Sequence, residues 1–199
     1  MKNLFSSLLV LVAVGTATPL ASAHFKLLAP TPTLVQDDRG NPQKLGPCGG
    51  TTADKGTPSN ATNKVKGGQK LHIKIEETVF HPGHYRVALA VNSPAQLPAD
   101  PEVMTRPSDR GPWSVSAAIA KQPQKPVLAD GLFVHTERPA AAWETDVDIP
   151  NINCEKCTLQ IVQFMAEHGY NPDGGYFYHH CADLQITADP GKPMYTSWK

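Results

Sequence analysis

The chain has 199 residues, of which 18 are Lys or Arg and 18 are Asp or Glu, so its formal net charge is zero. This balance argues against a nucleic-acid or anionic-membrane partner, because both favour a basic excess. Nineteen prolines and 15 glycines indicate many turns and long loops, which are typical of an all-β domain.

The first 23 residues have the order of a secretory signal peptide. Lys2 precedes an apolar run over residues 4–14, and Ala21-Ser22-Ala23 forms a small-residue cleavage site. The apolar run is too short to be a membrane-spanning helix. We therefore predict cleavage after Ala23, secretion to the extracellular space or the periplasm, and a single mature domain over residues 24–199.

Cleavage after Ala23 would give His24 a free α-amino group beside its own imidazole. These two nitrogens can close a chelate ring on a metal ion, which an internal histidine cannot do. Copper(II) favours nitrogen donors in a tetragonal plane, and imidazole is a common ligand for it. His24 is therefore the first candidate metal ligand.

Several segments after His24 alternate apolar and polar residues with the period of two that indicates β-strands. In the clearest of them, Leu71, Ile73 and Ile75 share one face, and His72 lies on the polar, solvated face. We predict strands over residues 25–29, 71–76, 85–91, 143–149, 158–165 and 176–186, with a short one at 132–135. We predict loops over residues 36–70 and over most of 92–142. This pattern favours an all-β fold, namely an immunoglobulin- or fibronectin-III-like β-sandwich with long loops.

The four cysteines of a secreted chain are expected to form two disulfides. Cys154-x-x-Cys157 also has the spacing of a redox pair, but such pairs use a helix N-terminus, and a β-type run follows here. A zinc site that adds His180 and Cys181 is disfavoured, because adjacent strand residues point to opposite faces. We predict the pairs Cys48–Cys181 and Cys154–Cys157, although four cysteines allow three pairings.

A second imidazole ligand must come from farther along the chain, because Lys26 occupies the third mature position. His81 and His84 flank a Pro-Gly turn at the sheet edge, from which a side chain can approach the N-terminus. We take His81 as the second ligand and His84 as the alternative. His179 and His180 are adjacent on the last predicted strand, so one is expected to be buried and the other exposed.

Three parts of the sequence together resemble a known family. They are the mature start His24-Phe25, His81-x-Gly83 with its apolar strand, and the closing segment from Phe164 to Leu184. They resemble the lytic polysaccharide monooxygenases and their copper-binding relatives, in which a histidine brace binds one copper ion. Residues 92–142 match no part of that pattern.

The resemblance implies a role for each matching residue. His24 and His81 would bind copper, and Tyr178 would occupy the axial position. His168 would hydrogen-bond an oxygen species beside the metal. Tyr176 replaces the glutamine that orients this oxygen species in the fungal enzymes, which is a departure from their pattern.

The resemblance leaves two functions open. The first, which we favour, is a copper-dependent enzyme that oxidatively cleaves a polysaccharide with the help of an external electron donor. The second is a copper-binding or copper-delivery protein, since Pro47-Cys48-Gly49-Gly50 resembles fungal relatives thought to handle copper through an additional aspartate ligand. Either protein would be a monomer without a nucleic-acid or membrane partner.

A polysaccharide would dock on exposed aromatic or polar side chains around His24, for which Tyr85, Trp113 and Tyr170 are candidates. A third class of function is a secreted adhesion or structural sandwich without a metal. Whether these aromatic side chains are exposed therefore helps to distinguish the three functions, namely the enzyme, the copper-binding protein and the sandwich without a metal.

Overall fold

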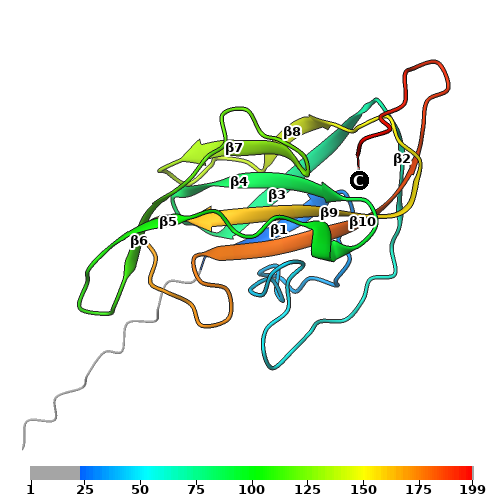
Figure 1. The fold of residues 1–199 in the computed structure, drawn as a ribbon. Coiled ribbons are helices and arrows are strands. Elements are labelled where there is room, and N and C mark those ends of the chain that lie inside the picture. Colours follow the sequence, from blue (N-terminus) through cyan, green and yellow to red (C-terminus); the bar gives the residue numbers. More distant parts are fainter. Residues whose placement is uncertain (1–22, 199) are drawn as a thin grey trace, which may run out of the picture.

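The computed structural model describes residues 23–198 (Figure 1). The predicted signal peptide lies outside the described residues, except for Ala23. One sheet has the strand order β1 (His24–Ala29), β3 (Lys70–Val79) and β8 (Trp143–Asp148). The other has the order β2 (Asn63–Lys66), β10 (Phe177–Thr187), β9 (Cys154–Met165), β4 (Gly83–Ala90) and β7 (Val127–His135). All pairings are antiparallel except that of β2 with β10.

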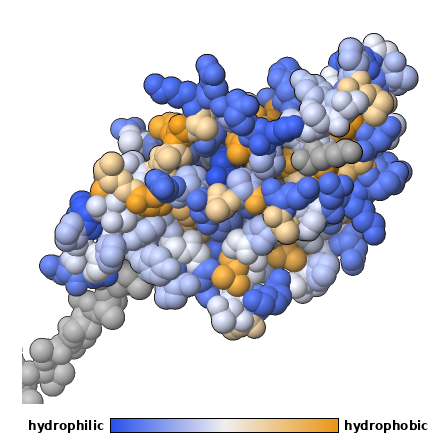
Figure 2. Space-filling view, viewed as in Figure 1, coloured by the Kyte–Doolittle hydropathy of each residue, from blue (hydrophilic) through white to orange (hydrophobic). Residues whose placement is uncertain are grey.

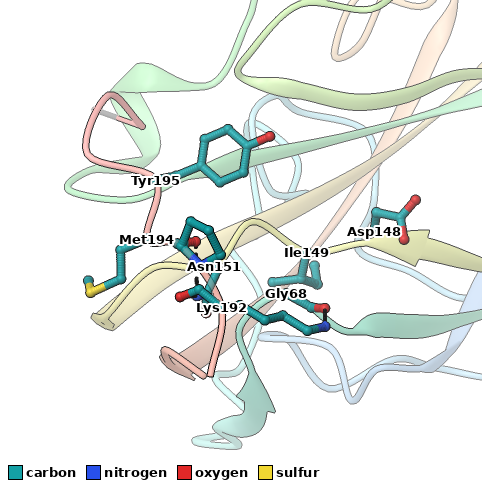
Figure 3. A pocket seen from close by; sticks show the side chains of 8 residues that line it. Gly68, Asp148, Ile149, Asn151, Lys192, Met194 and Tyr195 are labelled. Carbon is teal, nitrogen blue, oxygen red and sulfur yellow. Dashed lines mark hydrogen bonds between the residues drawn. The ribbon is translucent and has the colours of Figure 1, made fainter. Parts of the chain in front are cut away.

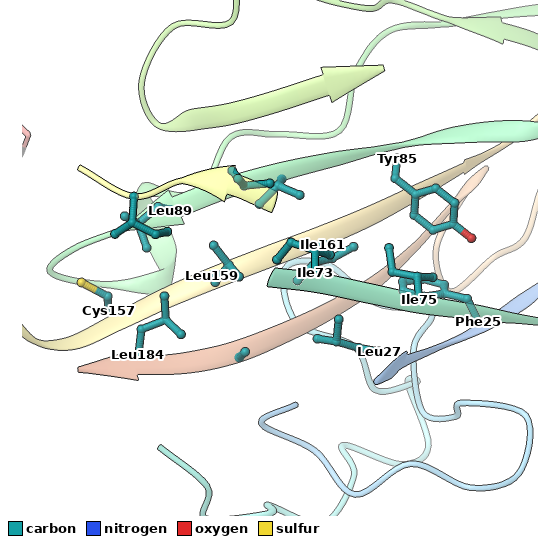
Figure 4. Close-up of a cluster of buried hydrophobic side chains, with 14 of the residues drawn as sticks. Phe25, Leu27, Ile73, Ile75, Tyr85, Leu89, Cys157, Leu159, Ile161 and Leu184 are labelled. Carbon is teal, nitrogen blue, oxygen red and sulfur yellow. The ribbon is translucent and has the colours of Figure 1, made fainter. Parts of the chain in front are cut away.

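The two sheets pack face to face as a β-sandwich, which confirms the predicted all-β fold. Apolar residues alternate along each strand, so one face of each sheet is apolar and faces the other sheet. Figure 4 shows this cluster. Its members include Phe25 and Leu27 of β1, Ile73 and Ile75 of β3, Tyr85 and Leu89 of β4, Leu159 and Ile161 of β9, and Leu184 of β10.

The outer face of the five-stranded sheet is also covered, by loops and by a hairpin. All eight residues of β4 are buried. The Gln160 side chain donates to the Pro47 carbonyl at 2.9 Å, and Arg86 donates to the Ala99 carbonyl at 3.0 Å. His179 is buried on this covered outer face, and His180 is buried on the core side of the same strand. The expectation that one of them would be exposed is therefore wrong.

Two segments predicted as loops contain regular structure. β2 forms within residues 36–70, and β5 (Val103–Arg106) pairs with β6 (Trp113–Ala117) as a separate hairpin within residues 92–142. A short 3₁₀ turn, η1 (Pro94–Gln96), precedes the hairpin, and β7 is longer than the predicted short strand. Among residues 23–198 no helix is long and apolar enough to cross a membrane.

Both predicted disulfides, Cys48–Cys181 and Cys154–Cys157, are present. The first joins the loop before β2 to β10 and closes a sequence separation of 133 residues. The second joins two residues of β9 that are three positions apart. Disulfides of this kind are typical of proteins that fold in an oxidising compartment.

On the face shown in Figure 2, hydrophobic residues lie in small separate groups among hydrophilic ones. The exposed large apolar side chains of the described chain come from different elements, for example Leu28, Met104 and Val134. Scattered residues of this kind are ordinary in globular proteins. Hydrophobicity therefore does not single out a site on this face.

Candidate metal centre

The pairing of β1 with β3 brings the two predicted metal ligands to the same end of the sandwich. His24 begins β1, and its Cα lies opposite that of Val79 near the end of β3. His81 follows two residues later, in the turn that joins β3 to β4. Both histidines are buried, with 5% and 7% of their surface exposed.

Tyr178 lies in the interior against His24. It is fully buried on β10, and its ring packs edge-on against the His24 imidazole with 5.4 Å between ring centroids. Alternation along β10 points Tyr178, His180 and Ala182 toward β1 and the core. The structure thus brings the predicted axial residue together with the first predicted ligand.

His168 lies against His81. The two rings are edge-on with 4.8 Å between centroids. The chain segments that carry them also meet, because the Ala166 amide donates to the Pro82 carbonyl at 2.8 Å. His168 Nδ1 lies 2.5 Å from the Gly169 carbonyl oxygen, so Nδ1 carries a proton.

The β5–β6 hairpin, which was not predicted from the sequence, positions the loop that carries His168. The buried Ser114 hydroxyl donates to the Met165 carbonyl at 2.7 Å and accepts the His168 amide at 3.0 Å. At the surface, Glu167 Oε2 pairs with Arg106 at 2.6 Å and accepts Trp113 Nε1–H at 3.2 Å. The hairpin therefore fixes both ends of the turn before His168.

Replacing Ser114 by alanine should destabilise the protein by about 1–3 kcal/mol, because a buried amide and a buried carbonyl would lose their partner. Urea unfolding of the metal-free protein measures this change. Ser116→Ala is the matched control, since Ser116 is exposed on the same strand. An equal loss in both variants would contradict a specific role of the Ser114 hydroxyl.

Tyr176 and His84 are not brought together with these four residues. The Tyr176 hydroxyl donates to the Pro112 carbonyl at 3.1 Å, and its ring belongs to a second apolar cluster outside the sandwich core. His84 points away from the core, opposite to Tyr85, and its ring packs on Phe164 of the same outer cluster at 5.2 Å. Burial lowers the pKa of His84.

The three aromatic residues considered as docking candidates differ in exposure. Tyr85 is fully buried in the core, so the hypothesis that it contacts a polysaccharide is wrong. Trp113 is half-buried beside Glu167. Tyr170 is 62% exposed and lies edge-on to Tyr176, with 5.6 Å between ring centroids. Trp113 and Tyr170 flank the loop that carries His168.

Directly beneath the His81 turn lies a buried polar cluster that was not predicted from the sequence. Glu77 Oε1 accepts the Tyr85 hydroxyl at 2.8 Å and Gln163 Nε2–H at 3.0 Å, and it lies 3.0 Å from His135 Nε2. Burial and the charge of Glu77 raise the pKa of Tyr85 well above its ordinary value. Burial alone would lower the pKa of His135, but hydrogen bonds to Glu77 and the Phe133 carbonyl outweigh it and raise that pKa.

His180 lies on the core side of β10 next to Phe25, and its Nε2 is 3.1 Å from the Phe25 carbonyl oxygen. Burial lowers its pKa from 6.5 to about 4. The folded protein therefore binds fewer protons than the unfolded chain between these values. As a result, its stability falls as the pH falls through this range.

We expect this loss to approach about 3 kcal/mol at the acidic end of the range. Urea unfolding of the metal-free protein from pH 7 to pH 4 measures it as the difference between wild type and His180→Gln. The variant lacks the titrating imidazole, so its stability should depend less steeply on pH. Parallel pH profiles would contradict the assignment to His180.

His24 also lines an open polar pocket of about 610 Å³. The other walls come from residues 35–57 and include Gln36, Asp37, Arg39 and Asp54. Slight burial raises the pKa of Asp37, but hydrogen bonds from Asn41 and Arg39 outweigh it and lower that pKa below its ordinary value. The pocket thus places the side chains of Asp37 and Asp54 beside the first predicted ligand.

A different pocket lies at the opposite end of β3, where the C-terminal segment packs (Figure 3). Asn151 Nδ2 donates to the carbonyls of Asp189, Lys192 and Pro193 and so fixes this segment. The lining contains Met194 and Tyr195 but neither histidine nor cysteine. Its chemistry does not suit a copper ion.

The donor set at the His24 end does suit copper. Among residues 23–198 no three His, Cys, Asp or Glu side chains are grouped so that they could hold a metal ion. A histidine brace needs only two imidazoles, because its third nitrogen is the N-terminal amine. His24 and His81 provide imidazoles at one end of the sandwich, and imidazole is the donor that copper(II) prefers.

No protein-family model matches this chain, and no curated protein matches it. The residues of the site and their chemistry are therefore the basis on which a function can be assigned.

Proposed function

We propose that this chain is a secreted copper protein with a histidine brace, and that it oxidatively cleaves a polysaccharide. The copper ion would be held by the α-amine and imidazole of His24, the imidazole of His81 and the side chain of Tyr178. The observation that carries the proposal is the pairing of aromatic contacts at one end of the sandwich, His24 with Tyr178 and His81 with His168.

Each of these residues has a defined part in the proposed reaction. The buried Tyr178 ring excludes water from the interior side of His24. The contact of His168 Nδ1 with the Gly169 carbonyl orients its imidazole beside His81. A bound copper ion would supply the oxygen and one-electron chemistry that breaks a glycan C–H bond, with electrons from an external reductant.

Tyr170 and Trp113 flank the same loop and offer aromatic surface to a sugar ring. Tyr170 is the more exposed of the two. This arrangement favours a polymeric substrate that lies across the end of the sandwich. A monomeric protein with such a surface would need only two partners, the polysaccharide and the electron donor.

Two observations favour copper binding or delivery as the second candidate function. Asp37 and Asp54 line the same pocket as His24, and the related fungal copper-binding proteins use an aspartate as an additional ligand. Tyr176 stands in place of the glutamine that orients oxygen in the fungal enzymes, and its hydroxyl donates to the Pro112 carbonyl at 3.1 Å. In this function no glycan would be cleaved.

The experiment that separates the two functions uses the chain that begins at His24, loaded with one equivalent of copper. It is incubated with cellulose, chitin or xylan and ascorbate, and the products are identified by mass spectrometry. We expect oxidised oligosaccharides from wild type and from the control His72→Ala, whose imidazole is half-exposed on β3. They should be absent from His24→Ala and His81→Ala.

Tight copper binding without any oxidised product would contradict the enzyme function and would support copper binding or delivery. Absence of tight copper binding would contradict both functions and would leave a secreted sandwich without a metal.

A further inference from the structure

A buried ion pair lies directly behind the turn that carries His81. Glu77 on β3 and His135 on β7 have 0% and 5% of their side-chain surfaces exposed, and Glu77 Oε1 lies 3.0 Å from His135 Nε2. The same His135 nitrogen lies 2.9 Å from the backbone carbonyl oxygen of His81. The pair therefore contacts the backbone of a predicted metal ligand.

Hydrogen bonds connect both partners to the residues around them. His135 Nδ1 lies 2.6 Å from the Phe133 carbonyl oxygen, so both ring nitrogens face hydrogen-bond acceptors. Glu77 Oε1 receives the Tyr85 hydroxyl and the Gln163 amide besides His135. Three side chains therefore meet at one oxygen of Glu77.

This cluster joins both sheets at one point. Glu77 comes from the three-stranded sheet, whereas Tyr85, His135 and Gln163 come from β4, β7 and β9 of the five-stranded sheet. Gln163 is also the residue directly opposite Tyr178 in the pairing of β9 with β10. Contacts from a single carboxylate thus extend toward both the second predicted ligand and the axial residue.

Stability alone does not account for such a cluster. Moving two charges into the interior costs as much free energy as their attraction returns, and apolar residues of similar volume are often at least as stable. By contrast, hydrogen bonds behind a ligand fix its orientation, and their loss typically weakens metal binding 10- to 100-fold. The position of this cluster behind His81 suits that role.

We propose that Glu77 and His135 are positioning residues that orient His81 for metal binding. This inference rests on the proposed function, since it requires His81 to be a ligand. Glu77 accepts the Nε2 proton of His135, and the same imidazole fixes the carbonyl of His81. The turn is thereby held in one conformation before any metal binds.

The test compares copper(II) affinity, by competition with a chelator, and the electron paramagnetic resonance spectrum of the copper-loaded chain that begins at His24. Glu77→Gln keeps the side-chain volume but removes the charge. We expect affinity to fall about tenfold and the copper hyperfine splitting to change. Circular dichroism establishes that each variant is folded under the conditions used.

Asp100→Asn is the matched control. Asp100 pairs with another buried histidine, His179, at 2.9 Å, and this pair lies on the outer face of the five-stranded sheet without contact to His81. The control should keep wild-type affinity and the wild-type spectrum. Wild-type values for Glu77→Gln and His135→Gln as well would overturn the inference.

If Glu77→Gln does not fold, Tyr85→Phe replaces it, because this variant removes one of the three donors to Glu77 Oε1 and keeps the ring. A changed spectrum or a weaker affinity supports the inference, and wild-type values overturn it. Failure of the proposed function is recognised separately, because wild type and His81→Ala would then bind copper equally well.

Discussion

A chain that begins at His24 should bind one copper(II) ion at least about 100-fold more tightly than a chain that begins at Ala23, a difference of about 2.7 kcal/mol. The extra residue converts the α-amine of His24 into an amide. The site thereby loses one nitrogen donor and the chelate ring. Competition with a chelator of known affinity measures both dissociation constants.

The extension is a mild change in every other respect. Ala23 lies in the core cluster of the structure, so a chain that begins there fits the same fold. The affinity of the His24 chain should also fall below about pH 7.7–8.0, where the amine becomes protonated. Equal affinities for the two chains would show that the amine is not a ligand.

The largest change in stability should follow from removing the Cys48–Cys181 disulfide. In the chain-entropy account, closing its loop of 133 residues stabilises the fold by about 4–5 kcal/mol. We expect Cys48→Ser combined with Cys181→Ser to lose this amount in urea unfolding of the metal-free protein. The control pair, Cys154→Ser with Cys157→Ser, closes a separation of only three residues and should cost about 1–2 kcal/mol.

The Cys48–Cys181 disulfide also holds a loop that contacts the strand beginning at His24. It holds residues 42–50 against β10, where the His179 amide donates to the Gln43 carbonyl at 2.7 Å. The Gln43 side chain in turn accepts the Phe25 amide at 3.0 Å, one residue from His24. Equal losses of stability in the two double variants would contradict the importance of the long loop.

The alternation of apolar and polar residues predicted the strands that build the core. It did not predict the structure that depends on contacts between residues distant in sequence. β3, β4, β8, β9 and β10 were evident because one face of each is apolar. β2 and the hairpin of β5 and β6 were missed because each of these strands has only four or five residues and none presents a buried apolar face. The prediction that either His179 or His180 would be exposed failed because the loop around Lys44 and the carboxylate of Asp100 cover His179 on the outer face.

Part of the candidate site had a signal in the sequence. The cleavage pattern and the Pro-Gly turn singled out His24 and His81 as candidates. Glu77 is the polar residue where the apolar positions of β3 would continue after Ile75, and Gln163 has the same relation to Ile161 in β9. Both residues lie near the C-terminal end of their strand. Their partner His135 comes from a third strand, and no local pattern relates it to them.

The nitrogen hyperfine structure in the electron paramagnetic resonance spectrum of the copper-loaded chain that begins at His24 tests the central claim most directly. We predict three nitrogen donors, one of which is lost in His81→Ala and another in the chain that begins at Ala23. His72→Ala should leave the spectrum unchanged. A spectrum that is the same in all four proteins would contradict a histidine brace formed by His24 and His81.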